Sequence, residues 1–497
     1  MDVPAADPTG STDYDELPYI SLPVAYTQPA HLAAVALLNG VELPAAENAR
    51  VLELGCATGG NIIPLAARFP DAIFRGIDLS RRHVDEARAR IDSLGLGNIE
   101  ILQADLATVS LGTQQYDYVI CHGVFSWVPS AAREAILRLC DRHLAPSGAA
   151  VISYNVLPGW HLRGAVRDVC QRFAGRERSP AERVRRARIA LSKIACASPT
   201  KTPYGQMLRA EAARTAKLPS SYILGEFLAA HNDPMHFHDF VAMAGRYNHA
   251  FLCEATPGAS AAAKRPETSA AQAADIEQYA DYVTGRPFRR SMLVRATGAA
   301  HSRTLSPANL HRLHISAKRH AEGDAANAGG EAMASKDATA AWILAQLAAG
   351  EPASLTPNQL AARSAAEGLI SQDDGTATIH ECLFRLVLAD AVGISTLPSM
   401  GGPATVERPC LWKVALAESA LGQPWLTSLT HDAVPLPREW RSLARYIDGR
   451  HSVTELRALL ASTLGVADMQ SAAQLADAVT QMIDDLARNA LLAPDGA

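Results

Sequence analysis

The chain has 497 residues, about three times the roughly 150 residues of a typical domain, so we expect several domains. Hydrophobic residues make up 48% of the sequence and charged residues 20%, a balance that is typical of globular proteins and excludes a disordered or fibrous chain. The formal net charge of −5 excludes a strongly basic nucleic-acid-binding protein.

The first residues, MDVPAADPTG, have neither the basic region nor the apolar region of a signal peptide. The chain contains no uninterrupted apolar stretch of about 18 residues, which argues against a membrane span. Its 8 cysteines include no CxxC pair, so the sequence indicates neither a disulfide framework nor a zinc site. We therefore expect a cytoplasmic protein.

From residue 50 to 153, short apolar runs alternate with amphipathic stretches, the pattern of a parallel sheet with crossover helices. The predicted strands are 51–54, 73–77, 99–102, 116–120 and 149–153. The predicted helices are 62–69, 81–94 and 131–144. This order predicts a doubly wound α/β unit.

The next segment, 160–230, is predicted to be helical and is rich in arginine. A helix over 237–244 and strands at 251–254 and 291–295 follow, and we expect these strands to complete the sheet, with 160–230 as an insertion over it. A separate α+β domain over 160–300 is the alternative. The basic residues of this segment form either a solvated helical face or a surface that attracts an acidic protein or a phosphate-bearing substrate.

Two low-complexity stretches, 257–274 and 323–338, are predicted connectors. Beyond them the sequence predicts Ala-rich helices at 341–347 and 359–367 and a linker at 397–403. A small helical domain is predicted around 440–448, 454–463 and 473–487. The expected domains are 1–158, 159–300, 301–395 and 396–497.

The glycine-rich turn after the first predicted strand, ELGCATGG (53–60), is the most informative motif. A strand that ends in such a turn and opens a helix lets a nucleotide cofactor approach the backbone closely. Gly55, Ala57 and Gly60 fit GxAxxG, a near match to the dinucleotide fingerprint, although Ala57 adds a methyl group where a pyrophosphate would lie. No lysine follows the turn, so a P-loop is excluded.

Three acidic residues favour a different cofactor. Glu53 places a carboxylate where a pyrophosphate would be repelled and an ammonium group attracted. Asp78 ends the second strand, where a carboxylate can accept both ribose hydroxyls, and Asp105 follows the third strand near an adenine amino group. Together they predict S-adenosylmethionine; taken singly, Asp78 can be a helix N-cap and Asp105 a turn residue.

With these residues identified, the chain resembles the class I S-adenosylmethionine-dependent methyltransferases, which have a Rossmann-like sheet. More narrowly, 14–300 resembles bacterial protein-lysine methyltransferases that carry a methyltransferase regulatory domain. The carrying stretches are YDELPYISLP (14–23), VLELGCATGGNIIPLA (51–66), GIDLS (76–80), YDYVICHGVFSWVP (116–129), SYNVLPGWH (153–161), HNDPMHFHDFVAMA (231–244) and IEQYADYVTGRPFRRSMLV (276–294). The ending, LARYIDGRHSVTELRALL (443–460), resembles winged-helix peptide-recognition modules weakly.

The resemblance implies a set of cofactor-binding residues, in which His122 and Gly123 lie beside the methionine part and Ala57 replaces the family's usual glycine. The predicted set is Glu53, Gly55, Ala57, Gly59, Asp78, Leu79, Asp105, Leu106, His122 and Gly123.

The acceptor is expected beyond the fourth and fifth strands. His122 can act there as a base or as a positioned contact, and Tyr19 or Tyr154 can orient an amine. Trp127 and Trp160 can line an aromatic slot, with ordinary packing as the alternative for each. The Asn-Pro-Pro-Tyr type motif of several amino-group methyltransferases is absent.

A cluster of His231, His236, His238 and Asp239 is the sole metal-like pattern. On a helix, His236 and His238 point about 200° apart, so we expect no metal.

The resemblance implies an enzyme that N-methylates protein lysines. The alternatives are methylation of a small molecule or peptide natural product, and a non-catalytic scaffold that binds the cofactor. We expect no nucleic-acid partner.

Overall fold

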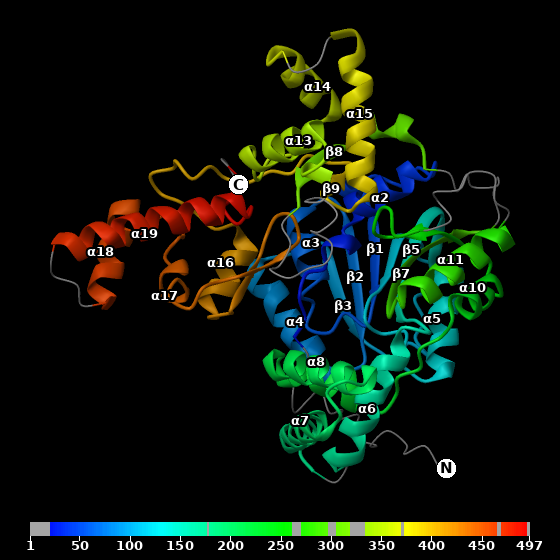
Figure 1. The fold of residues 1–497 in the computed structure, drawn as a ribbon. Helices are drawn as coiled ribbons and strands as arrows, with labels where there is room; N and C mark the ends of the chain where they lie inside the picture. Colours follow the sequence, from blue (N-terminus) through cyan, green and yellow to red (C-terminus); the bar gives the residue numbers. More distant parts are fainter. Residues whose placement is uncertain are drawn as a thin grey trace.

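The computed structural model describes residues 20–175, 178–260, 270–296, 305–318, 333–368, 372–464 and 469–494. At its centre is a seven-stranded sheet of order β3-β2-β1-β4-β5-β7-β6 (Figure 1). The first five strands in the chain are parallel, whereas β7 runs antiparallel to both of its neighbours. The strands are β1 (Arg50–Leu54), β2 (Ile73–Asp78), β3 (Ile99–Gln103), β4 (Tyr116–Cys121), β5 (Leu144–Asn155), β6 (His249–Glu254) and β7 (Phe288–Arg295).

This sheet confirms the predicted doubly wound Rossmann-like fold. The two late strands, β6 and β7, complete the sheet as expected. The crossover helices also lie where the sequence predicts them: α3 (Ile62–Arg68), α4 (Arg81–Leu94) and α5 (Ser130–His143). Ser80 caps α4 by accepting from the His83 amide, and Gly95 ends it in the left-handed conformation.

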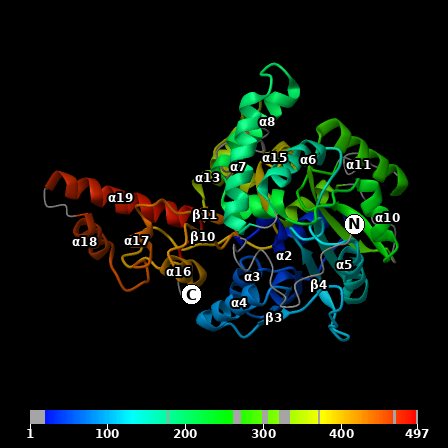
Figure 2. The same ribbon diagram turned by 90° about the horizontal axis from the view of Figure 1, so that it is seen from below.

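The segment between β5 and β6 forms a helical insertion with a core of its own. Pro180 and Pro203 stand at the first helical position of α7 and α8, where the missing N–H costs nothing. Figures 1 and 2 show α6, α7 and α8 beyond the end of the sheet at which β5 leads into α6, rather than on a face of the sheet. The elements are α6 (Trp160–Ala174), α7 (Pro180–Ala197), α8 (Pro203–Lys217), α9 (Ser220–Ile223) and the π-helical η3 (Leu224–Leu228).

Much of the basic character of this insertion serves its own folding. Several arginines donate to main-chain carbonyl groups at helix ends, as the C-terminal end of a helix dipole favours. These arginines are Arg167, Arg183, Arg186, Arg188 and Arg209. The stretch is therefore more than a solvated face.

A middle region packs on a helix from the start of the chain. Helix α2 (Pro29–Leu38) is apolar on all sides and almost wholly buried, as a helix without a polar face must be. It lies against β9 (Val392–Ser395), which pairs with β8 (His314–Ala317). Around this pair are η1 (Ala25–Thr27), η5 (Pro307–Arg312), α13 (Ala338–Ala349), α14 (Pro357–Ala366) and α15 (Gln372–Leu388).

One predicted connector is partly wrong. Residues 270–274 begin α11 (Ala270–Thr284), because alanine, which dominates this stretch, is the strongest helix former. Residues 261–269 and most of the second connector, 323–332, lie outside the described residues.

The C-terminal region is helical, as predicted, and packs around a third core. Its first helix, α16, contacts α3 and α4 of the sheet domain. The predicted helix at 440–448 is reduced to a single turn. The elements are α16 (Lys413–Ala420), the hairpin β10 (Trp425–Thr427) and β11 (Ala433–Pro435), α17 (Arg441–Ala444), α18 (Val453–Leu464) and α19 (Met469–Arg488). Among the residues that the structure describes, no helix is long and apolar enough to cross a membrane.

Candidate functional site

The glycine-rich turn lies at the carboxyl end of β1, the edge at which open α/β sheets bind ligands. Gly55 has φ of +75°, and a Cβ on it would lie 2.4 Å from Cγ2 of Val124, so no side chain fits there. Ala57 also has positive φ, at 47°, a conformation that costs an L-residue about 1 kcal/mol. This backbone explains why glycine is usual at that position.

Glu53 is a buried acid with unused hydrogen-bonding capacity. Its side chain is 4% exposed. Oε1 accepts a hydrogen bond from Nδ2 of Asn61 at 2.9 Å, whereas Oε2 is buried without a hydrogen-bond partner. Burial, with a smaller effect from the charge of Asp78, raises the pKa of Glu53 to about 8. A ligand ammonium group would give Oε2 a partner and favour the charged carboxylate.

Asp78 lies at the end of β2, beside the glycine-rich turn, and its carboxylate binds the backbone of that turn. Its Oδ2 accepts from the Ala57 amide at 2.8 Å, and Oδ1 accepts from the Ser80 amide at 3.0 Å. His83 lies 3.3 Å from Oδ1. A carboxylate has about four acceptor positions, so capacity remains for a ligand hydroxyl. The helix N-cap itself is Ser80, not Asp78.

Asp105 and two leucines lie at the same edge of the sheet. Asp105 is exposed, and its Oδ1 accepts from the Ala107 amide at 2.8 Å, the turn role that was the alternative to adenine binding. Leu79 is 56% exposed and Leu106 is partly exposed. Apolar side chains left accessible beside two carboxylates can cover the faces of a flat ring.

The segment before α2 covers the turn from the other side. Ser21 accepts from the Gly60 amide at 2.9 Å, and the Val24 amide donates to Oδ1 of Asn61 at 2.9 Å. Tyr19, predicted to orient an amine, lies outside the described residues.

A polar cluster fills the end of β4. His122 Nδ1 lies 2.5 Å from the Tyr26 hydroxyl and 3.1 Å from Oγ of Ser153, which also accepts from the Gly123 amide at 2.8 Å. The guanidinium group of Arg290 lies 4.5 Å from the centre of the Tyr26 ring. Burial, with help from the positive Arg290, lowers the pKa of His122 to about 4. His122 is therefore neutral near pH 7 and a weak base, which favours the positioned contact over the proton acceptor.

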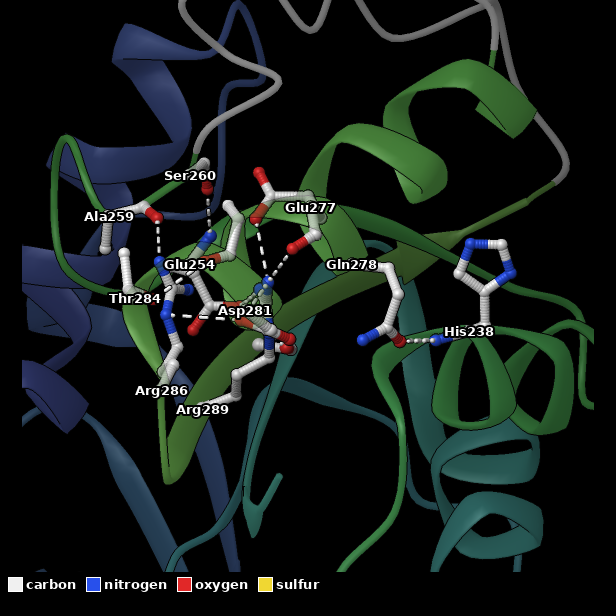
Figure 3. Close-up of polar contacts among 12 residues, drawn as sticks. His238, Glu254, Ala259, Ser260, Glu277, Gln278, Asp281, Thr284, Arg286 and Arg289 are labelled. Carbon is white, nitrogen blue, oxygen red and sulfur yellow. Dashed lines mark hydrogen bonds and ion pairs between the residues drawn. The ribbon is translucent and has the colours of Figure 1, made fainter. Parts of the chain in front are cut away.

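Arg289, the neighbour of Arg290 in β7, is the centre of a buried ion network (Figure 3). Arg289 is 0% exposed and points away from Arg290, because successive strand residues face opposite sides. Its guanidinium group contacts Glu254 of β6 at 2.7 Å and two acids of α11, Glu277 at 3.0 Å and Asp281 at 2.9 Å. These contacts join β6, β7 and α11.

The aromatic residues predicted to lie at the acceptor site differ in their burial. Trp127 is partly buried and meets Trp160 edge to face, with ring centres 6.0 Å apart. Tyr154 is 1% exposed and stacks on Phe240 at 4.0 Å. The Tyr154 ring therefore packs in the core, and its role in orienting an amine stays a prediction.

The histidines near the start of α10 (Phe237–Gly245) do not converge. His238 pairs with Asp275 at 3.0 Å, and His236 lies against the Tyr282 ring. Within the described ranges, no group of three or more His, Cys, Asp or Glu residues is placed to hold a metal ion.

Several residues of the site have no signal in the sequence. Most of them reach it from distant parts of the chain, whereas Asn61 directly follows the glycine-rich turn. They are Tyr26, Asn61, Ser153, Arg290 and, from the C-terminal hairpin, His431, which donates to Asn61 at 2.8 Å.

Comparison with known families gives two matches. Residues 51–148 match the family described as a methyltransferase domain. Residues 219–295 match the family described as a predicted methyltransferase regulatory domain. The first match contains the glycine-rich turn, and the second contains β6, β7 and the Arg289 network.

Two uncharacterised proteins of Rickettsia prowazekii are relatives. RP789 is 37% identical over 287 residues, which are 56% of this chain and 52% of RP789, so the match spans about half of that relative's length. RP028 is 30% identical over 237 residues, which are 48% of this chain and 95% of RP028.

A solved structure, PKMT2 from Rickettsia typhi, is similar in fold across 96% of this chain and 100% of its own, with a TM-score of 0.82 and 23% identity. PKMT2 in complex with AdoHcy matches with a TM-score of 0.80.

Proposed function

Because the chain belongs to the S-adenosylmethionine-dependent methyltransferases that carry a methyltransferase regulatory domain, we propose that it N-methylates lysine side chains of a protein substrate. The observation that carries this proposal is the likeness to PKMT2, a protein-lysine methyltransferase by name, which includes the accessory regions as well as the sheet. Accessory regions next to the acceptor side suit a substrate larger than a metabolite.

In the proposed cofactor site, Glu53 binds the ammonium group, Asp78 the ribose hydroxyls and Asp105 the adenine amino group. Leu79 and Leu106 cover the adenine. The backbone of the turn, at Gly55, Ala57 and Gly59, lies along the cofactor, and His122 and Gly123 lie beside its methionine part. The unpartnered Oε2 of Glu53 fits a ligand with a cation at one end.

When bound, the cofactor supplies an electron-poor methyl group on a sulfonium. The chain must then hold a neutral amine in line with that group, and alignment provides a large part of the rate gain. A lysine has an ordinary pKa of about 10.4, and a site bordered by buried side chains and the cation of Arg290 favours its neutral form. Trp127 is proposed to line the slot that receives the lysine side chain.

The first test is to incubate the protein with methyl-labelled S-adenosylmethionine and whole-cell extract and to separate the products by size. We expect label on protein that is recovered as N-methyl-lysine after complete hydrolysis. Label confined to small molecules would instead support metabolite or peptide methylation. Cofactor binding without any label would support the scaffold alternative.

Replacing Asp78 by Ala tests the ribose assignment. We expect the affinity for S-adenosylhomocysteine to fall about 10- to 100-fold, because hydrogen bonds to a charged group contribute roughly 1.5–3 kcal/mol. Titration calorimetry measures this loss. Asp71→Ala is the matched control, since Asp71 is an exposed acid at the amino end of the same strand. Unchanged affinity in Asp78→Ala would contradict the assignment of Asp78 to the ribose hydroxyls. This variant would then no longer distinguish an enzyme from a scaffold that binds the cofactor.

A further inference from the structure

Asn61, at the start of α3, is the point where the proposed cofactor site meets the rest of the chain. Its Oδ1 accepts from the Val24 amide at 2.9 Å and its Nδ2 donates to Glu53 at 2.9 Å. A backbone N–H can only donate, so the oxygen must face Val24 and the nitrogen must face Glu53. Asn61 is 4% exposed. The orientation of the Glu53 carboxylate therefore depends on what holds Asn61.

Asn61 Oδ1 also accepts from the Thr27 hydroxyl at 3.1 Å, and a further partner comes from the C-terminal region. His431 Nε2 lies 2.8 Å from Oδ1 of Asn61 and must carry the proton, because an amide oxygen cannot donate. Burial, with help from the positive Arg68, lowers the pKa of His431 to about 3. The imidazole is thus a neutral donor near pH 7. Its 2% exposure keeps water from replacing it.

His431 is presented by the tip of the β10–β11 hairpin, which faces the sheet domain (Figure 2). Its backbone has φ of +67°, in the left-handed region that Asn, Asp and His adopt more often than other side chains. Hydrogen bonds within the tip maintain it: the His431 amide donates to the Ser428 carbonyl at 3.0 Å, and the Ser428 amide to the Asp432 carbonyl at 2.9 Å. These bonds fix the direction in which the His431 side chain leaves the hairpin.

An independent contact joins the same hairpin to the glycine-rich turn. Arg90 of α4 lies 3.3 Å from the Thr58 carbonyl and 3.4 Å from Oε1 of Glu418. Glu418 in turn accepts from the Thr427 amide at 2.6 Å. Two chains of contacts, through Asn61 and through Arg90, thus end on one hairpin.

We infer that the C-terminal hairpin is part of the cofactor site, with His431 as a positioning residue that acts through Asn61 on the carboxylate of Glu53. This inference rests on the proposed role of Glu53. Because coupling between two sites is reciprocal, docking of the hairpin strengthens cofactor binding, and bound cofactor strengthens docking of the hairpin. The C-terminal region then controls how well the enzyme holds its cofactor.

The test is a double-mutant cycle on affinity for S-adenosylhomocysteine, measured by titration calorimetry. His431→Asn keeps a residue that tolerates positive φ but is too short to reach Asn61. We expect it to weaken binding roughly 10-fold in the wild-type background and to have no further effect in a Glu53→Gln background. His451→Asn is the control, since His451 lies in the same region but contacts Asp448.

Additive effects of the two substitutions, or wild-type affinity in His431→Asn, would overturn the inference. If Glu53→Gln itself binds like the wild type, the proposed cofactor role of Glu53 fails instead. A second measurement needs no variant: saturating S-adenosylhomocysteine should slow hydrogen exchange of the amides at 426–433 in the wild-type protein. Unchanged exchange there would also contradict the coupling.

Discussion

Glu53→Gln is expected to weaken binding of S-adenosylhomocysteine about 100-fold or more. The substitution keeps the size of the side chain and its contact with Asn61, but removes the charge that a buried ammonium group requires. Truncating one member of a buried charged pair costs roughly 2–5 kcal/mol, which corresponds to a factor of about 30 to several thousand. Titration calorimetry gives the affinity, and thermal unfolding verifies that the variant is folded.

The number of protons released when the cofactor binds identifies Glu53 as the carboxyl group that pairs with the ammonium group. With its pKa raised to about 8, Glu53 is mostly protonated at about pH 6.5, whereas an ammonium ligand favours the ionised form. Binding must therefore release close to one proton per cofactor below the raised pKa, and less as the pH rises through it. Calorimetry in buffers of different ionisation enthalpy measures this number. Proton release that persists in Glu53→Gln would assign it to another group.

Arg289→Met is expected to lower the free energy of unfolding by about 3–5 kcal/mol, the usual cost of leaving buried charges without their partner. The buried carboxylates of Glu254, Glu277 and Asp281 lose their shared cation. Chemical denaturation measures the change. Arg185→Met, which removes an exposed arginine paired with Glu182, is the control and should change stability little.

The pH dependence of this loss has a definite direction. Burial would raise the pKa of Glu254, but the charges of Arg289 and Arg286 and the hydrogen bond from the Arg290 amide together hold the pKa below its ordinary value. In the wild type, this depressed pKa contributes stability above the ordinary pKa, and the contribution is lost as the pH falls through the folded value. Without Arg289, burial raises the pKa instead. The difference between variant and wild type should therefore shrink from about pH 8 to about pH 5, and a constant difference would contradict the electrostatic explanation.

The parts of the site that the sequence predicts are those formed by neighbours in the chain. Glu53, the glycine-rich turn and Asp78 belong to strand–turn–helix units, whose geometry is local. Strand alternation separates Tyr154 from its neighbour Ser153: Ser153 reaches the Gly123 amide, so the Tyr154 ring faces the opposite side of the sheet and packs in the core.

The remaining site residues depend on docking that no local pattern encodes. Tyr26 meets His122 across 96 residues of sequence, and His431 meets Asn61 across 370. Such pairs form only after separate regions have packed together. A histidine in a short hairpin gives no indication of its partner. The domain boundaries and the residue roles remain predictions, with the experiments above as their tests.

The helical insertion leaves and rejoins the sheet at almost the same place. Val156 bridges to Met235, and the Leu157 amide donates to the Met235 carbonyl at 3.0 Å. The helices between these points, α6 to η3, pack around a core of their own. A change in the length or sequence of this excursion can therefore leave every strand of the sheet in place.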